Sequence, residues 1–331
     1  MLMFTAAVGL NATAAVEVKG NTLTLNDIYV RDPYIYADES THTYYLYRSS
    51  HENQPNGTFR GGVEVFQSKD LKNWTGPKRV LTIPKDNWIT GAVWAPEMHE
   101  YNGKYYLFAT INSDVVWRQD AARPWLKYTW RGTQIFRAES PEGPFEAFDD
   151  KMPITPYSQM CLDGTLYEEN GQPYLVYCHE WVEITDGTMN AVSLSKDLSH
   201  RIGEPVTLFC SSAASWSTGL DQPDGSKSYI TDGCYLYKSE KSGKLFMIWS
   251  SFDNGQYALG VAESATGRVL GPWIQQPEPI FSHNGGHGMI FRSFNGDLYL
   301  ILHSPNEPDQ AERAHLFKLI DTGNTLTLAN E

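Results

Sequence analysis

Apolar and polar residues follow a repeating order along the chain: a strand-like run, a polar turn and a second strand-like run. The order is first seen at residues 32–47 and returns four times, at 95–109, 163–177, 232–249 and 287–302. Asn-Gly or Ser-Gly stands at the turn in four of the five copies. These dipeptides favour tight hairpin turns, because such turns need residues that tolerate positive φ. The pattern therefore predicts five β-hairpins.

Further strand-like segments with a shared polar tail follow the hairpins, for example Val65–Trp74 and Val192–Leu198. Five copies of about four strands, with few helical stretches, predict an all-β fold, the five-bladed β-propeller with antiparallel blades. The blades are expected near residues 27–90, 91–157, 158–226, 227–281 and 282–331. A β-sandwich is the alternative, but five matching hairpins disfavour it. We expect one catalytic domain over residues 21–331.

Residues 1–20 begin with an apolar run and continue into Ala12-Thr13-Ala14. Small residues after an apolar run are typical of the end of a signal peptide, although the usual basic start is missing. We therefore expect either a signal-peptide remnant or an N-terminal arm, and a secreted or periplasmic protein. No apolar run reaches the roughly 18 to 20 residues of a membrane helix.

The chain of 331 residues carries a formal net charge of -13, with 10 Trp, 19 Tyr and 14 Phe. An acidic surface repels phosphates, so nucleic acid and anionic membranes are disfavoured as partners. Most aromatic residues are expected in a β-rich core, and a few are candidates for stacking on sugar rings. The expected partner is an oligo- or polysaccharide, bound by a monomer.

In a propeller the first strand of each blade lies nearest the axis, so residues that begin those strands converge on a central pocket. The five starts are predicted at Asp32, Glu97, Asp163, Asp232 and His287. Several carboxylates placed close together cost electrostatic energy unless a cation or a shared proton uses them. This arrangement indicates a functional site.

The ordered motifs at the blade starts resemble those of glycoside hydrolase family 43, a family of five-bladed propellers that includes arabinanases and β-xylosidases. They are Arg31-Asp32-Pro33, Trp94-Ala95-Pro96-Glu97, Leu162-Asp163-Gly164 and Gly286-His287-Gly288. The resemblance implies an inverting mechanism, in which one carboxylate activates water and a second group protonates the leaving oxygen. It implies that Asp32 is the general base and that Asp163 orients the acid and raises its pKa.

The general acid is where this sequence departs from the family, which usually has a Glu at the start of the fourth blade. Asp232 stands there instead and is slightly favoured by position. Glu180 is the alternative, because an antiparallel return from Asp163 brings the end of that hairpin back to the same face of the propeller. If Glu180 is the acid, Asp232 becomes a substrate ligand or a supporting group.

Other residues are candidates for binding sugar. Trp94 and Trp181 flank predicted pocket positions and are expected to stack on a ring or to pack in the core. Glu97 is expected to bind or support the sugar. His303 and Arg313 are rim candidates on the last blade, where an arginine would bind sugar hydroxyls or keep Asp32 ionised.

A cation is a further expectation from the family resemblance. The family often places a histidine near a bound ion at the axis, commonly calcium, and His287 is the matching residue. Calcium prefers oxygen ligands, so a water-bridged ion, a directly bound ion and a purely structural histidine are all open.

The expected function is a glycosidase that removes terminal sugars from plant-type polysaccharide, with exo-α-L-arabinofuranosidase first. β-Xylosidase, endo-arabinanase and β-galactosidase or galactofuranosidase are alternatives within the family. A carbohydrate-binding propeller without catalysis is the alternative from another class, suggested by the departure at Asp232. The sequence contains no phosphate-binding loop, no His-Glu-x-x-His and no Gly-x-Ser-x-Gly, which disfavours nucleotide, zinc-protease and esterase functions.

Overall fold

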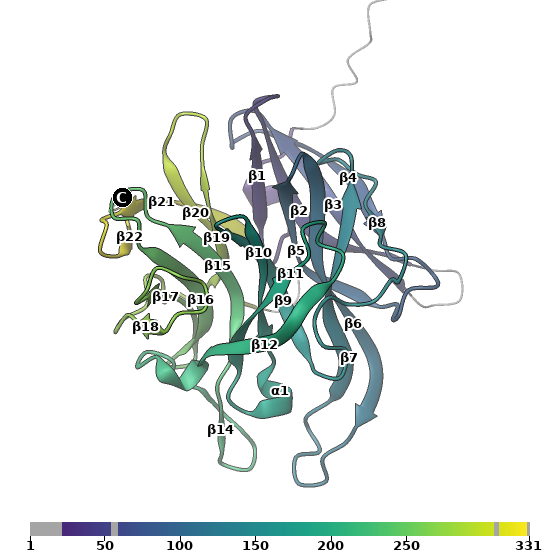
Figure 1. Ribbon diagram of the computed structural model, residues 1–331, viewed down its shortest axis with the longest axis vertical. Helices are drawn as coiled ribbons and strands as arrows, with labels where there is room; N and C mark the ends of the chain where they lie inside the picture. The colour runs from purple at the N-terminus through teal and green to yellow at the C-terminus, as the bar shows by residue number, and fades with distance from the viewer. Residues whose placement is uncertain (1–21, 54–58, 308–310, 330–331) are drawn as a thin grey trace, which may run out of the picture.

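The computed structural model describes residues 22–53, 59–307 and 311–329. Five four-stranded antiparallel sheets account for most of these residues (Figure 1). The first sheet contains β1 (Tyr34–Asp38), β2 (Thr43–Asn53), β3 (Phe59–Ser68) and β4 (Trp74–Thr82). The second contains β5 (Ala92–Tyr101), β6 (Lys104–Arg118), β7 (Tyr128–Ala138) and β8 (Glu146–Ala147).

The other three sheets repeat this order. The third contains β9 (Cys161–Glu169), β10 (Gln172–His179), β11 (Thr188–Leu194) and β12 (Arg201–Cys210). The fourth contains β15 (Asp232–Lys238), β16 (Leu245–Asp253), β17 (Gln256–Ser264) and β18 (Trp273–Gln275). The fifth contains β19 (Gly286–Arg292), β20 (Leu298–Ser304), β21 (Arg313–Asp321) and β22 (Leu326–Leu328).

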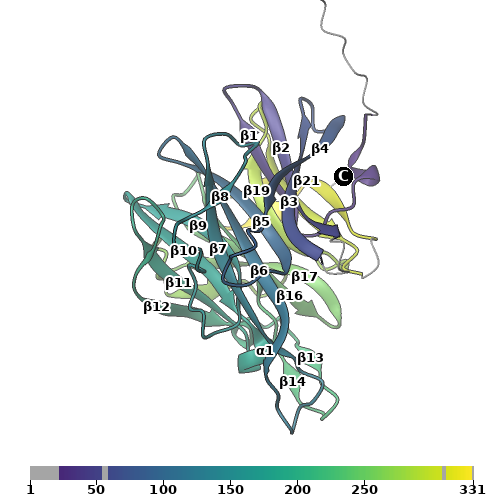
Figure 2. The same cartoon turned by 90° about the vertical axis from the view of Figure 1, so that its right-hand side faces the viewer.

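The first strands of the five sheets form the inner ring of the molecule. β1, β5, β9, β15 and β19 each contact the next, and β19 contacts β1, which closes the ring. Each sheet is thus one blade, and each lies within the residue range that the sequence predicts for it. The predicted all-β, five-bladed propeller is confirmed (Figure 2).

The hairpin turns have the backbone that their residues predict. Asn102 and Gly103 between β5 and β6 have φ values of 50° and 72°, and Asn170 and Gly171 between β9 and β10 have 52° and 76°. Asparagine and glycine tolerate this left-handed region better than other residues, so these turns connect neighbouring strands in two residues. Between blades, aromatic side chains such as Trp74 and Trp249 are fully buried and form the core.

Several short elements lie outside the blades. They are η1 (Leu25–Asp27), α1 (Trp181–Ile184), η2 (Ser211–Ala213), β13 (Leu220–Asp221) and β14 (Lys227–Ser228). In Figure 1, α1, β14 and the β6–β7 hairpin extend from the same end of the propeller, at the bottom of the view. Residues 119–127 form the loop between β6 and β7.

The N-terminal segment joins the first and last blades. Leu23 pairs with Trp74 at the start of β4, and Tyr29 pairs with Arg313 at the start of β21. The predicted signal-peptide remnant, residues 1–20, lies outside the described residues. Within the described part of the chain, we find no helix with the length and apolarity needed to cross a membrane.

Candidate active site

The five inner strands begin with the same backbone feature. Each has a residue with positive φ close to its start, within two residues before the strand or among its first four: Asp32 (53°), Ala95 (43°), Asp163 (56°), Gly233 (52°) and His287 (46°). In blades two to five, the pairing of the first two strands is interrupted by a register shift next to this residue. Such a bulge turns a side chain away from the sheet, here toward the propeller axis. Four of the five residues are not glycine, and strained backbone at such equivalent positions is typical of a functional site.

This alignment corrects one of the five predicted blade starts. In the second blade the equivalent residue is Ala95, two positions before Glu97. In the fourth blade it is Gly233, directly after Asp232, which begins β15 as predicted. Asp232 instead corresponds to the residue that precedes each positive-φ position, as do Arg31 and Trp94. The sequence repeat did not reveal this shift, because hairpin spacing alone does not locate a bulge.

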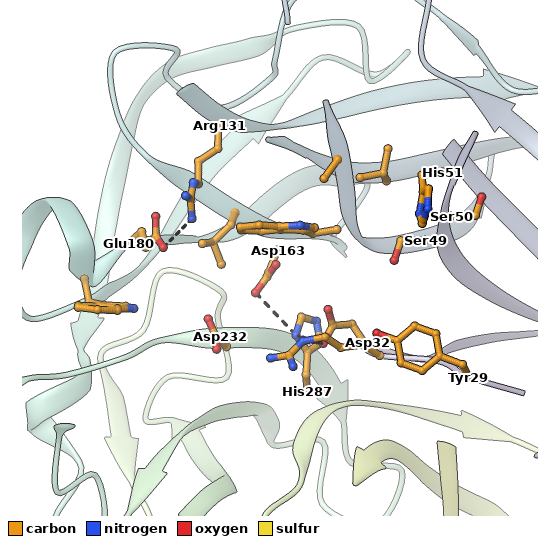
Figure 3. A pocket seen from close by; sticks show the side chains of 16 residues that line it. Tyr29, Asp32, Ser49, Ser50, His51, Arg131, Asp163, Glu180, Asp232 and His287 are labelled. Atoms are coloured by element: carbon orange, nitrogen blue, oxygen red, sulfur yellow. Dashed lines mark hydrogen bonds and ion pairs between the residues drawn. The ribbon is translucent and has the colours of Figure 1, made fainter. Parts of the chain in front are cut away.

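One cavity of about 730 Å³ lies at this end of the axis (Figure 3). Its lining brings together seven of the predicted site residues: Asp32, Asp163, Asp232, Glu180, Trp94, Trp181 and His287. Its remaining lining residues are Tyr29, Arg31, Ser49, Ser50, His51, Ala92, Val93, Arg131 and Leu162. A cavity with four carboxyl groups and several aromatic rings has the composition of a site for a polar ring-shaped ligand.

Asp32 is surrounded by nitrogen atoms. Its Oδ1 lies 3.1 Å from Nδ1 of His287 and 3.8 Å from Nε of Arg31. Burial disfavours the charged carboxylate, but the attraction of His287 and Arg31 is stronger and lowers the pKa of Asp32 well below its usual range. Asp32 is therefore ionised at neutral pH.

His303 supports Asp32 from below the cavity. Its ring is fully buried, and its Nδ1 accepts a hydrogen bond of 3.2 Å from the backbone N–H of Asp32. Burial lowers the pKa of His303 to about 4, so the ring is neutral and its proton is on Nε2. That nitrogen donates to Oδ1 of Asn306 at 3.3 Å. His303 thus holds the backbone of Asp32 in place.

Asp163 lies on the other side of His287, with Oδ2 at 3.7 Å from its Nδ1. The same oxygen accepts a hydrogen bond of 3.1 Å from the N–H of Gly233, and the N–H of Asp163 donates to Oγ1 of Thr110 at 2.9 Å. Burial, with the nearby carboxylates of Asp232 and Asp32, raises the pKa of Asp163. Asp32 and Asp163 thus occupy equivalent backbone positions, but the surroundings of Asp32 lower its pKa and those of Asp163 raise its pKa.

His287 supplies a positive charge between these two carboxyl groups. Burial disfavours the imidazolium, but Asp32 and Asp163 raise the pKa of His287 to about 10. The backbone N–H of His287 donates a hydrogen bond of 2.8 Å to Oγ of Ser250, which fixes the backbone at this bulge.

The donor set here does not fit a calcium ion. A histidine nitrogen that faces two carboxylates as a donor is not free to ligate calcium, which prefers six to eight oxygen ligands. Among the residues that the structure describes, no group of three or more His, Cys, Asp or Glu side chains is arranged to hold a metal. Calcium at His287 stays a prediction.

Glu180 occupies the wall of the cavity formed by the third blade, directly after β10 and at the start of α1. Its Oε1 accepts a hydrogen bond of 2.7 Å from Nη1 of Arg131, and both side chains are buried. Burial raises the pKa of Glu180 to about 7, although Arg131 acts in the opposite direction. The second oxygen, Oε2, is buried and has no hydrogen-bond partner.

Arg131 is itself held in position. Its guanidinium carbon lies 4.7 Å from the ring centre of Trp94, and its Nη2 donates to Oγ1 of Thr129 at 2.9 Å. A cation stacked on an aromatic face is stabilised by the ring quadrupole. Trp94 therefore supports Arg131, which in turn orients Glu180. The sequence did not point to Arg131, because the residue comes from the third strand of its blade, where no repeated motif marks it.

In Figure 3, Asp232 lies between Glu180 and His287. Its Oδ2 accepts a hydrogen bond of 3.1 Å from the hydroxyl of Tyr257. Burial raises the pKa of Asp232, while His287 and Arg31 oppose this effect. The negative charge of Asp32 raises it further, so these two groups are close electrostatic neighbours.

Three predicted binding residues lie outside the cavity lining. Glu97 is buried, it is not among the residues that line the cavity, and its Oε2 lies 3.0 Å from Nε2 of His99. His303 is covered completely by Asp32 and its neighbours. Arg313 donates to backbone oxygens, of Asn26 at 2.7 Å and of Glu312 at 2.9 Å. In this structure all three contact protein groups beneath or beside the cavity.

A five-bladed propeller with carboxyl groups gathered at one end of its axis is an arrangement typical of glycoside hydrolases. The chain belongs to the glycosyl hydrolases family 43, which matches residues 27–321. The resemblance seen in the sequence is thereby confirmed.

Solved and curated relatives agree with this membership. The structure is similar to the endo-arabinase from Bacteroides thetaiotaomicron VPI-5482, with 37% identity, a TM-score of 0.78 and coverage of 92% of this chain and 99% of that one. A xylosidase/arabinosidase of Butyrivibrio fibrisolvens is 25% identical over 73% of this chain and 44% of its own length. An extracellular exo-α-(1→5)-L-arabinofuranosidase of Streptomyces avermitilis is 24% identical over 71% and 47%. The chain spans less than half the length of these two curated relatives.

Proposed function

We propose that this protein is a glycosidase that hydrolyses α-L-arabinofuranosyl linkages of arabinan with inversion at the anomeric carbon. The observation that carries the proposal is the opposite tuning of two carboxyl groups in one cavity. The pKa of Asp32 is held low by cations, whereas burial raises the pKa of Glu180 to about 7. A pair of groups whose environments separate their pKa values is the pattern expected for a base and an acid.

In this mechanism Asp32 is the general base. Its carboxylate accepts a proton from a water molecule, and that water attacks the anomeric carbon. His287 and Arg31 keep the carboxylate ionised before the reaction, and His303 fixes its backbone. The proton moves onto Asp32 as the bond between water and carbon forms.

Glu180 is the general acid. Its protonated carboxyl donates a proton to the glycosidic oxygen while the bond between that oxygen and the anomeric carbon breaks. A pKa of about 7 allows the group to carry its proton at neutral pH and to release it in the reaction. Oε2 has no hydrogen-bond partner within the protein, so a proton on this oxygen is not engaged by another protein group.

Asp232 is less suitable as the acid. Its carboxylate accepts a hydrogen bond from Tyr257, and its charge acts on the pKa of Asp163 while that of Asp32 acts on its own. Asp232 therefore belongs with Asp32 and Asp163 to one group of carboxyls at the axis, the axial group. The charges that act on the pKa of Glu180 are those of Arg131, Asp232 and Glu183. Inversion needs the acid and the base about 6.5–9.5 Å apart to leave room for water, which favours the carboxyl group outside the axial group. We assign Asp232 to sugar hydroxyl binding and Asp163 to positioning of the axial group.

Arabinan is proposed as the substrate because a relative that is 37% identical and matches this chain over nearly its full length is described as an endo-arabinase. The curated relatives also include a xylosidase/arabinosidase, an extracellular endo-arabinanase and an extracellular exo-arabinofuranosidase, and the last two support secretion as part of the proposal. A β-xylosidase is the second candidate, since the Butyrivibrio relative is described as a xylosidase/arabinosidase.

The test measures release of nitrophenol from aryl α-L-arabinofuranosides and β-D-xylosides, and of reducing sugar from arabinan. We expect turnover of the arabinosides, with an anomeric product that NMR shows as inverted. Turnover of the xyloside alone would show that the enzyme is a β-xylosidase and that arabinan is not its substrate. No turnover of any glycoside or of arabinan would instead favour a carbohydrate-binding propeller.

A further inference from the structure

The cavity does not end at the axial carboxyl groups. It continues past Asp32 along four residues that we call the blade-1 arm: Tyr29, Arg31, Ser49 and Ser50. Ser49 and Ser50 come from β2, and Tyr29 and Arg31 from the segment that joins the last blade to the first. Figure 3 shows Glu180 on one side of Asp163, and Tyr29, Ser49 and Ser50 on the other side of Asp32.

The order of the blades around the axis supports this placement of Glu180 and the blade-1 arm. Glu180 belongs to the third blade, and the closed ring of inner strands places the first and fifth blades next to each other and across from it. The blade-1 arm and the proposed acid therefore lie at opposite ends of one cavity. The base, Asp32, lies between them.

The arm is built from anchored polar groups. Nη1 of Arg31 lies 3.1 Å from Oε1 of Glu312, whose side chain is only 2% exposed, while the side chain of Arg31 is 40% exposed. Oγ of Ser50 accepts a hydrogen bond of 3.0 Å from Nη1 of Arg79, which leaves its own proton for another acceptor. The backbone oxygen of Tyr29 accepts from Nη1 of Arg48 at 3.0 Å.

These groups suit a neutral, hydroxylated ligand. Arg31 lies beside the carboxylates of both Glu312 and Asp32, so its charge is balanced and an anionic ligand gains little. Guanidinium N–H groups and serine hydroxyls bind sugar hydroxyls, and a tyrosine ring provides an apolar face for a sugar ring.

The chemistry of inversion decides which sugar occupies the arm. The leaving group departs toward the acid, and water attacks from the opposite side, where the base lies. An arm on the far side of Asp32 from Glu180 is therefore closed to the leaving group. It is open to the part of the chain that continues from the attacked sugar toward the nonreducing end.

We infer that the blade-1 arm binds a second sugar residue on the nonreducing side of the cleaved bond. This inference rests on the proposed function and deepens it, because it favours substrates that place at least two sugars before the cleavage point. It thus opposes the removal of single terminal units that the sequence first suggested.

The test compares kcat/KM for an aryl α-L-arabinofuranoside and the corresponding aryl α-1,5-L-arabinobioside. The variants are Ser49→Trp, which fills the arm, and Tyr29→Ala, which removes its ring. Tyr157→Ala, at a side chain that is 57% exposed outside the cavity, is the matched control. We expect wild type and control to prefer the bioside by about tenfold or more, and Ser49→Trp to lose most of that preference. Tyr29→Ala should lose a smaller part.

A wild type that prefers the single sugar, or arm variants that keep the full bioside preference, would overturn the inference. A second measurement separates it from the proposed activity: calorimetric titration of Glu180→Gln with arabinotriose, with and without Ser49→Trp. Weaker binding in the double variant supports the arm even where turnover is slow. If Ser49→Trp does not change the affinity for arabinotriose, the inference that the blade-1 arm binds sugar is overturned. Absence of turnover in wild type counts instead against the proposed glycosidase activity.

Discussion

Asp32 and Glu180 line the same cavity but lie in opposite surroundings. Asp32 faces two positively charged side chains, His287 at 3.1 Å and Arg31 at 3.8 Å, and its pKa is lowered. Glu180 faces one cation, Arg131 at 2.7 Å, is deeply buried, and has its pKa raised to about 7. Both carboxyl groups are desolvated, so burial alone does not distinguish them.

The difference lies in how the positive charge is supplied. At the axis two cations approach one carboxylate, and their combined attraction exceeds the cost of removing it from water. At the third blade a single stacked guanidinium contacts one oxygen and leaves the other without a partner. In the proposed mechanism, this difference in the number of cations makes Asp32 the base and Glu180 the acid, which the following experiments test.

The largest effect is expected for Asp32→Asn. An amide of the same shape accepts no proton from water, so kcat on aryl arabinosides should fall by about 10³-fold or more. Asp149→Asn, at an exposed carboxylate, is the control and should retain wild-type rates. Retention of activity in Asp32→Asn with an unchanged melting temperature would assign the base to another group.

Glu180→Gln should have the next largest effect, and one that depends on the leaving group. Loss of the acid should reduce kcat by about 10²-fold for arabinan and much less for a dinitrophenyl glycoside, whose leaving group needs no proton. In the wild type, the acid loses its proton as pH rises through about 7, so activity should fall above that pH. This alkaline limb should disappear in the variant. If Asp232→Asn shows this behaviour instead, the acid is Asp232.

Arg131→Gln tests the cation at the third blade with a smaller change. Arg131 lowers the pKa of Glu180, so its removal should raise that pKa and shift the alkaline limb of the pH profile to higher pH. Arg137→Gln, an exposed arginine on the same strand, should leave the profile in place. A shift to lower pH, or none, would contradict the role given to Arg131.

The sequence predicted the ring of blades because hairpin turns are local. Asn102-Gly103 and Asn170-Gly171 adopt the positive φ that their residues favour, and five such hairpins leave few other architectures. It also predicted that Asp32, Asp163 and Asp232 meet, because they lie at blade starts. Glu97 was expected among them but contacts His99 instead, since the bulge at Ala95 was not visible in the spacing.

The partners of the carboxyl groups were harder to predict. Arg131 reaches Glu180 from another blade, and His303 lies beneath Asp32 although their positions in the chain differ by 271 residues. Contacts of this kind depend on the twist of each sheet and on side-chain packing between blades, which a single sequence does not contain. For the same reason, the charge of His287 followed only from its distances to two carboxylates.

The smallest effect is expected for removal of calcium. His287, with its pKa raised to about 10, already places a positive charge between Asp32 and Asp163, so an ion is not needed to keep Asp32 ionised. Treatment with a chelator such as EDTA should therefore change kcat/KM by less than about twofold and leave the melting temperature in place. Activity that is lost with EDTA and restored by calcium, but not by magnesium, would show that the axis holds an ion. The charge balance proposed for Asp32 would then include that ion as well as His287 and Arg31.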